Sequence, residues 1–261
     1  MRVIVTRPLE QAAEWVAALR SHRIDAVALP LIAIAAAPDP RAVEAEWARL
    51  HDRQLVVFVS PNAASAFFAS APAGWRWPPM TRAASPGSGT TRKLVDLGVP
   101  PALVDAPAES AAQFDSEALW ERLRQRTWHD ASVLLVRGTR GRDWLAGRLV
   151  EAGAQVDELA AYRRETPALD PAARADLRQA LARPVEHLWL FSSSEAIDRL
   201  VEQIAVAAAD ASADAATWGS ARALATHPRI AQRAREAGFG VVLEARPTPA
   251  AVVACIQSIR P

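Results

Sequence analysis

The stretch VIVTRP at residues 3–8 and the stretch VLLVRG at residues 133–138 decide the fold. Each is a short apolar run, rich in β-branched residues, that leads directly into an arginine. A segment with apolar residues at helical spacing follows each one, and then a second apolar run comes at residues 26–29 and 156–159. This order predicts a strand–helix–strand unit, which builds parallel sheets. Its appearance twice predicts two similar α/β domains.

Two further pairs of segments support an internal duplication. FVSPNAASAF (58–67) resembles FSSSEAIDRL (191–200), and SPGSGTTRKLVDLG (85–98) resembles THPRIAQRAREAG (226–238). Both members of the first pair are typical of a strand, a serine turn and a helix. Both members of the second pair are typical of a turn, a helix and a glycine at the helix C-terminus.

The order of these segments predicts that one domain is inserted in the other. The expected partners of the N-terminal unit lie in the last third of the chain, and the residues between hold a full set of elements of their own. We therefore expect a discontinuous domain of residues 1–36 and 168–261, and an inserted domain of residues 37–167. Two further short strands, residues 31–36 and 160–165, should run side by side as a two-stranded linker.

The composition excludes several classes of protein. The 261 residues carry 30 basic and 29 acidic side chains, a balance that gives no overall field for nucleic acid or a membrane surface. Cys255 is the only cysteine and the histidines are scattered, so we expect no internal disulfide and no metal site. Arg7 and Glu10 interrupt the first apolar run too early for a signal peptide. A cytoplasmic protein without a membrane segment is expected, and a monomer, because no large apolar face is indicated.

The nucleotide-binding motifs are weak or missing. The sequence contains neither a GxxxxGK[ST] phosphate loop nor a GxSxG nucleophile elbow. Gly87-Ser88-Gly89 begins like a dinucleotide fingerprint, but Arg92 stands where the third glycine should be. A flavodoxin-like flavin or nucleotide enzyme stays an alternative, but this sequence lacks the phosphate loop that such an enzyme needs.

The candidate ligand-binding residues follow the predicted strands. In a parallel sheet, the turns that follow the strands all lie at the carboxyl ends of the strands. Open α/β folds bind ligands at this edge, and the helix N-termini there favour anions. The predicted binding residues are Arg7, Ser60, Asn62, Gly87, Thr90, Arg137, Gly138, Arg140, Ser192, Ser193 and His227. The small polar residues among them could instead serve only as helix N-caps, and Arg7 and Arg137 could instead form ion pairs at the strand ends.

Tyr162 is the only tyrosine of the chain and lies in the predicted linker, directly before Arg163 and Arg164. A tyrosine in a strand usually packs in the core with its hydroxyl group satisfied. Its position between two predicted domains also suits a catalytic group, so both roles stay open.

On these segments the chain resembles the uroporphyrinogen-III synthase family along nearly its whole length. The matching segments, in order, are VIVTRP with LPLIAI, FVSPNAASAF, GSGTTRKLVDLG, DSEALWERL and VRGTRGRDWLAGRLVEAGAQVDELAAYRRETP. The last of these is the most specific, since it carries the family's Arg-Gly…Gly-Arg and Tyr-x-Arg pattern. Two places depart from the family. Pro86 precedes Gly87, and His227-Pro228-Arg229-Ile230 stands where some members have a Gly-Pro-Thr-Thr-like turn, so His227 or Arg229 would replace that hydroxyl contact.

The resemblance implies two α/β domains joined by a two-stranded linker, with the active site between them and with no cofactor or metal. It implies the cyclisation of hydroxymethylbilane, a linear tetrapyrrole polycarboxylate, to uroporphyrinogen III with loss of water and inversion of ring D. Tyr162 would then donate a hydrogen bond or act as a weak general acid for loss of the hydroxyl group. Ser60, Thr90 and Ser193 would hold carboxylates or pyrrole nitrogens, and the arginines would pair with carboxylates. A bilobal small-molecule-binding protein without catalysis is the other alternative.

Overall fold

A computed structural model describes residues 1–108, 111, 113–210 and 219–259, and the chain divides into two compact units. Unit 1 consists of Met1–Ala33 with Glu165–Pro261, and unit 2 is the continuous segment Ile34–Arg164. The predicted domain boundaries, after residues 36 and 167, lie three residues further along the chain at each crossing.

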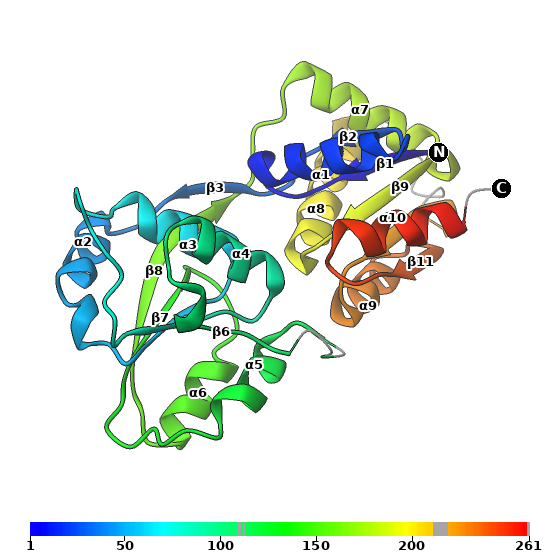
Figure 1. Cartoon of the computed structure of the whole chain (residues 1–261). Helices are drawn as coiled ribbons and strands as arrows, with labels where there is room; N and C mark the ends of the chain where they lie inside the picture. The colour runs from blue at the N-terminus through cyan, green and yellow to red at the C-terminus, as the bar shows by residue number, and fades with distance from the viewer. Residues whose placement is uncertain (109–110, 112, 211–218, 260–261) are drawn as a thin grey trace. The chain divides into compact units, whose positions relative to one another are not determined.

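Unit 1 is built on a parallel sheet with the strand order β11-β10-β9-β1-β2. Its strands are β1 (Arg2–Val5), β2 (Ala26–Ala28), β9 (His187–Phe191), β10 (Arg222–Ala225) and β11 (Val241–Glu244). Its helices are α1 (Leu9–Ser21), α7 (Pro171–Ala182), α8 (Ser194–Asp210), α9 (Pro228–Glu236) and α10 (Pro249–Ser258), with a short 3-10 turn η3 (Pro184–Glu186) before β9 (Figure 1).

Helices cover both faces of this sheet. Val5 and Leu190 belong to a core that α1 and α10 close on one face. The neighbouring residues Ile4 and Trp189 are buried on the other face, and α8 packs against α9. Because side chains alternate along a strand, burial of consecutive residues means that both faces are covered, as is usual for a parallel sheet.

Unit 2 is built on a second sheet with the strand order β3-β8-β7-β4-β5-β6. Its strands are β3 (Ala33–Ala36), β4 (Leu55–Phe58), β5 (Arg82–Ala84), β6 (Val104–Asp105), β7 (Ser132–Gly138) and β8 (Gln155–Glu165). Its helices are α2 (Pro40–Ala48), α3 (Pro61–Ala69), α4 (Ser88–Asp96), α5 (Ser116–Leu123) and α6 (Trp144–Glu151), with 3-10 turns η1 (Leu50–Asp52) and η2 (Pro101–Leu103). The strands from β8 to β6 are parallel.

The two faces of this sheet also hold separate cores. Val56 and Phe58 pack with the aromatic side chains of α2 and α3, and with α4. Leu55 and Val57 pack with α5 and α6 on the opposite face (Figure 1). Each domain is therefore a three-layer α/β sandwich, and the predicted α/β class with parallel sheets is confirmed.

A capping side chain followed by proline fixes the start of several helices. The capping residues that accept a hydrogen bond from the first turn and precede a proline are Asp39 (α2), Ser60 (α3), Asp170 (α7), His227 (α9) and Thr248 (α10). Proline suits the first helical position because its missing N–H would have no partner there. The repeat-related glycines Gly98 and Gly238 end α4 and α9 with φ values of 100° and 95°, as predicted for a helix C-terminus.

The predicted strands at 156–159 and 160–165 form one strand, β8, instead of two. The corresponding run near the N-terminus is broken into β2, in the sheet of unit 1, and β3, in the sheet of unit 2, with Pro30 between them. Proline cannot donate to a sheet ladder, so it interrupts the strand, whereas the chain from 155 to 165 has no such residue. β3 and β8 are neighbours in the sheet, as the linker prediction requires.

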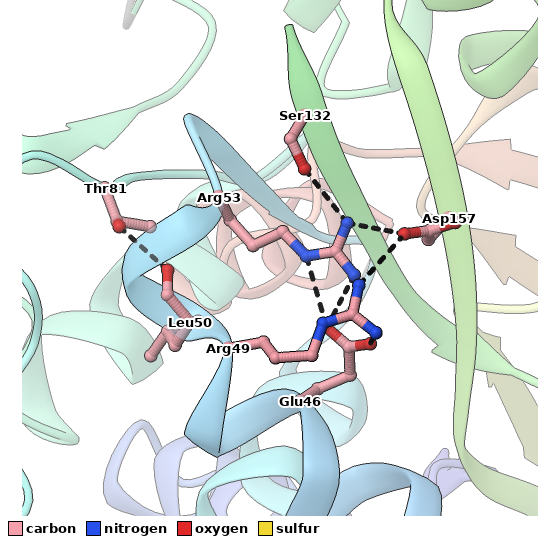
Figure 2. Close-up of polar contacts among 7 residues, drawn as sticks. All are labelled: Glu46, Arg49, Leu50, Arg53, Thr81, Ser132 and Asp157. Atoms are coloured by element: carbon pink, nitrogen blue, oxygen red, sulfur yellow. Dashed lines mark hydrogen bonds and ion pairs between the residues drawn. The ribbon is translucent and has the colours of Figure 1, made fainter.

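A buried arginine ties α2 to the amino ends of β7 and β8 (Figure 2). Arg53 is only 3% exposed. Its guanidinium group donates to Glu46 at 2.7 Å and 3.2 Å, to Asp157 at 2.5 Å and to Ser132 at 3.0 Å. Arg49 reaches the same two carboxylates only at 3.8 Å and 3.9 Å and is largely exposed. We call these five residues the Arg53 cluster.

Candidate active site

The predicted site residues of unit 2 gather at the carboxyl edge of its sheet. Tyr162 of β8 is paired with Gly138 of β7, Ser60 follows β4, and Gly87 follows β5. These four strands are adjacent and parallel. The order along the edge is therefore Tyr162, Gly138, Ser60 and Gly87, at the place where α/β folds bind ligands.

Two polar side chains contact the hydroxyl group of Tyr162. Its Oη accepts a hydrogen bond from Arg164 Nη2 at 3.2 Å and lies 3.3 Å from Ser60 Oγ. The guanidinium carbon of Arg164 is 5.7 Å from the centre of the Tyr162 ring, within cation–π distance. The tyrosine side chain is fully buried. The phenol is thus fixed by packing and joined to a cation.

Gly138 leaves the space that the Tyr162 ring occupies. A Cβ atom at position 138 would lie 2.8 Å from Tyr162 Cζ and 3.0 Å from Cε2, well inside the contact distance of two carbon atoms. The register between β7 and β8 shifts at this residue, and the amide of Thr139 donates to the Tyr162 carbonyl at 3.1 Å. Gly138 therefore acts on the site by positioning the tyrosine.

Arg137 forms an ion pair at the strand end. Its Nη1 donates to Asp143 Oδ1 at 2.5 Å and to Glu158 Oε2 at 2.7 Å. Burial disfavours the charge of Arg137, but the hydrogen bonds and charges of these two carboxylates outweigh burial and raise its pKa. A Cβ atom at Gly141 would lie 2.9 Å from Arg137 Nη2. Arg137 thus holds the loop after β7 and is already neutralised by the protein.

The other two arginines of this loop differ in their partners. Arg142 makes two hydrogen bonds to the Glu117 carboxylate of α5, at 2.7 Å and 3.1 Å. Arg140 is exposed, and among the described residues nothing holds its side chain. Arg140 is the cation of this loop that an external carboxylate can reach.

Ser60 and Asn62 lie at the start of α3. Ser60 Oγ accepts the Ala63 amide at 3.1 Å, so it caps the helix in addition to contacting Tyr162. Asn62 is the second helical residue and is partly exposed. The capping and ligand-binding roles of Ser60 are therefore compatible.

The backbone of the turn around Gly87 is engaged in hydrogen bonds to the first turn of α4. The Gly87 carbonyl accepts the amides of Thr90 and Thr91, both at 3.0 Å. Thr90 is buried, and the hydroxyl pair of this turn is Ser85 with Thr91, at 2.8 Å. Ser85 and Thr91 were not among the predicted site residues.

The predicted site residues of unit 1 also lie on one sheet edge. Arg7 follows β1, Ser192 and Ser193 follow β9, and His227 follows β10, and these strands are adjacent and parallel. The two serines are partly exposed before α8. His227 Nδ1 accepts the Arg229 amide at 3.1 Å and so caps α9.

Arg7 is a partly buried cation without a bonded carboxylate partner in the described structure. Its guanidinium carbon lies 4.4 Å from the centre of the Trp15 ring, and Nη1 donates to Gln11 Oε1 at 3.3 Å. Its Nε is buried and has no partner among the described residues. Desolvation lowers the pKa of Arg7 to about 10, although the charge of Glu14 opposes the shift. An anionic ligand would remove this deficit.

Neither a metal cluster nor a membrane span is found in the part of the chain that the structure describes. Within it, no group of three or more histidine, cysteine, aspartate or glutamate side chains is arranged to hold a metal ion. No described helix is both long enough and apolar enough to cross a bilayer.

Comparison with known proteins identifies the family. The family model described as uroporphyrinogen-III synthase HemD matches residues 13–254. The chain belongs to the uroporphyrinogen-III synthase family. It is therefore a lyase of haem biosynthesis that closes hydroxymethylbilane to uroporphyrinogen III, with loss of water and inversion of ring D.

Solved synthases share the fold of the whole chain. A mutant uroporphyrinogen III synthase from the extremely thermophilic bacterium Thermus thermophilus is similar with a TM-score of 0.60 at 19% identity, over 99% of this chain and 96% of that chain. The uroporphyrinogen-III synthetase from Helicobacter pylori 26695 is similar with a TM-score of 0.55 at 16% identity, over all of both chains. At these identities the likeness establishes the two-domain α/β fold.

Sequence reasoning did not select four residues that contact the candidate site: Arg164, Ser85, Thr91 and Trp15. Arg164 had a usable signal, since it lies two positions after Tyr162 and side chains two apart share a face of a strand. Ser85, Thr91 and Trp15 had no comparable signal, because their contacts depend on the turn after β5 and on how α1 packs.

Proposed function

We propose that Tyr162 is the proton donor for loss of the substrate hydroxyl group in the synthase reaction of this chain. The contact of its hydroxyl group with Arg164 and Ser60, at the carboxyl edge of unit 2, carries the proposal. A core tyrosine needs one partner for its hydroxyl, whereas this one has a cation and a second hydroxyl beside it.

The chemistry needs a modest acid and close positioning. The terminal hydroxyl group of hydroxymethylbilane leaves with help from the pyrrole nitrogen, which gives an azafulvene. The last ring then attacks through its substituted carbon, and reopening and reclosure invert that ring. Because the substrate also closes spontaneously without inversion, the enzyme must favour one geometry over another.

Substrate access to Tyr162 requires movement. The side chain has no exposed surface, so the groups over its hydroxyl must shift when substrate binds.

Arg7 and Arg140 are proposed as ligands for substrate carboxylates. Arg7 is desolvated, and the described residues include no carboxylate bonded to it, so a substrate carboxylate bound there would form charge-assisted hydrogen bonds in a water-poor setting. Arg140 is exposed beside Gly138. Arg137 serves as a positioning residue, since Asp143 and Glu158 already occupy its guanidinium group.

The polar turns complete the proposed binding surface. Ser192 and Ser193 before α8, Asn62 in the first turn of α3, and the turn from Gly87 to Thr90 offer hydroxyl, amide or backbone N–H donors. His227 caps α9 at the same sheet edge as Arg7.

We also propose that the enzyme is a cytoplasmic monomer. The single cysteine fits a reducing compartment. A net charge of +1 gives no support for a nucleic-acid partner.

The test feeds freshly made hydroxymethylbilane to the purified protein and separates the oxidised type I and type III isomers. Type III product is expected to dominate. Tyr162→Phe should lower kcat by at least about 100-fold, in the range for loss of a general acid, and should shift the product toward type I. Unchanged turnover in this variant would assign Tyr162 to packing.

A further inference from the structure

The hydrogen bonds around the Tyr162 hydroxyl have a direction. A guanidinium N–H can only donate, so Oη is the acceptor in its 3.2 Å contact with Arg164. Ser60 Oγ accepts the Ala63 amide at 3.1 Å, which leaves the serine proton unused. That proton can be donated to Tyr162 Oη across the 3.3 Å that separates them.

We propose that Arg164 is a positioning residue that, with Ser60, turns the phenol proton of Tyr162 toward the substrate. A phenol oxygen has one proton and two acceptor positions. When Arg164 and Ser60 both donate, the two acceptor positions are filled, and the O–H is left for a third partner. The proposal rests on the acid role proposed for Tyr162.

The same arrangement serves the proton transfer. As the C–O bond of the hydroxymethyl group breaks, its electron pair stays on oxygen, which takes the phenol proton and leaves as water. The nitrogen lone pair of that pyrrole forms the new double bond, and the resulting phenolate takes up the pyrrole N–H proton to give the neutral azafulvene. Between these steps Oη carries a negative charge, which the adjacent guanidinium and the Ser60 hydroxyl stabilise without having to reorient.

Arg163 provides a matched control. It has the same side chain one position earlier in β8, but it is exposed, and alternation along the strand directs it to the other face. A change at Arg163 alters the charge of the strand equally and leaves the contacts of Tyr162 in place.

The first test observes the phenol directly. Tyr162 is the only tyrosine, so protein made with tyrosine labelled at the ring carbon that bears oxygen gives one NMR signal for it. Arg164→Gln and Ser60→Ala should each move this signal, and Arg163→Gln should leave it within the line width. If the chemical shift of this signal is the same in Arg164→Gln as in the wild type, the proposal is overturned.

The second test separates positioning from substrate binding. Arg164→Gln should lower kcat about tenfold, the size expected for one charged hydrogen bond, with little change in KM, and Arg164→Lys should recover part of the loss. In a Tyr162→Phe background, Arg164→Gln should have no further effect on kcat. An equal loss in both backgrounds, or a rise in KM alone, means that Arg164 acts independently of Tyr162.

The outcomes keep the two proposals apart. Full activity in Tyr162→Phe ends the acid role and the role of Arg164 with it. A large loss in Tyr162→Phe combined with full activity in Arg164→Gln ends only the role of Arg164. If Arg164→Gln does not fold, as judged by circular dichroism, Arg164→Lys carries the same comparisons, because it keeps the charge and loses the planar fork.

Discussion

Arg7 and Arg137 occupy the same place in the two units but differ in charge balance. In unit 2, Glu158 lies opposite Leu135, two positions before Arg137, and its carboxylate bonds the guanidinium group. In unit 1, the residue opposite Val5, two positions before Arg7, is Ala28. Both units thus have an arginine at this place, but unit 1 lacks the carboxylate that Glu158 provides in unit 2. The contact of Arg137 with Glu158 is a model, within the same chain, of how Arg7 would hold a carboxylate of the substrate.

Ala28→Glu should therefore supply from the protein the carboxylate that we assign to the substrate. The new side chain should pair with Arg7, raise KM about tenfold or more and leave kcat nearly unchanged, because it competes only for a binding contact. Steady-state kinetics on hydroxymethylbilane provides the measurement. Ala17→Glu, on an exposed position of α1, is the control for added charge. An unchanged KM in Ala28→Glu would exclude Arg7 as a substrate ligand.

Arg7→Met should make the protein more stable and weaken its binding of substrate. Because the pKa of Arg7 is lowered to about 10, mainly by desolvation, the charged side chain destabilises the native state at every pH below that value. Removing the charge should raise the free energy of unfolding by about 1–2 kcal/mol, while the methionine keeps a contact with Trp15.

The sign of the pH effect follows from the same shift. The unfolded chain holds the Arg7 proton more tightly than the native protein, so wild-type stability rises as pH climbs above about 10. The advantage of Arg7→Met, measured by urea unfolding, should be constant near pH 8 and shrink as the pH rises above about 10. Arg2→Met, at a half-exposed pair with Asp25, should change stability by no more than about 0.5 kcal/mol. A variant that is less stable at pH 8 would contradict this account.

Local sequence could indicate candidate site residues but not the groups that contact them. The position of Arg7, Ser60 and Tyr162 after or within apolar runs marked them as candidates. Whether an arginine at a strand end is paired depends on the neighbouring strand, as Glu158 and Ala28 demonstrate. The contact of Tyr162 with Ser60 joins residues of β8 and of the turn after β4, two strands that β7 separates in the sheet, and no local pattern encodes that arrangement. For these reasons the capping and ion-pair alternatives stayed open until the fold was known.

At the scale of elements, the Arg53 cluster joins one helix to two strands (Figure 2). Arg53→Met should lower the free energy of unfolding by about 3 kcal/mol, because it leaves the nearly buried Glu46 carboxylate without its cation. The kcat of the folded variant should not change, since the cluster lies at the amino ends of strands whose carboxyl ends carry Tyr162 and Gly138. Chemical unfolding and the isomer assay measure the two effects.

Arg49→Met is the matched control for this cluster. It removes an arginine near the same carboxylates, but at 3.8 Å and 3.9 Å and in solvent, so the expected loss is below about 0.5 kcal/mol. Equal losses in the two variants would show that burial of Arg53 does not set the strength of the cluster.

The elements themselves were largely predictable because their signals are local. Cap-and-proline pairs such as Ser60-Pro61 and His227-Pro228 begin helices through bonds within one turn. Residues 156–165 were expected to form two strands and lie in one, β8, which is paired with a strand on each side. No residue in this run signals whether the strand continues or breaks. The difference from unit 1 lies in Pro30, whose effect on the chain is local and visible in the sequence.

At the scale of the whole molecule, each described hydrophobic cluster lies within one unit. Unit 2 is also a single continuous segment. A fragment of residues 34–164 should therefore fold alone, with a cooperative thermal transition and native-like near-UV circular dichroism from its tryptophans. It should not raise the type III fraction, because Arg7 and Ser193 are missing. A fragment without fixed tertiary structure would show that unit 2 depends on unit 1.

The placement of β1 has a consequence for synthesis of the chain. Thr6, directly after β1, donates its side-chain hydroxyl to Leu190, 184 positions later, and β1 lies between β2 and β9 in its sheet. On the ribosome, all of unit 2 emerges before β9 does. The N-terminal strand must wait with one edge unpaired while the inserted domain folds, although domains generally fold in order from the N-terminus. β1 is therefore made before all of unit 2 but is expected to be among the last strands to complete its native pairing, and during that interval its apolar VIV segment presents an unpaired strand edge.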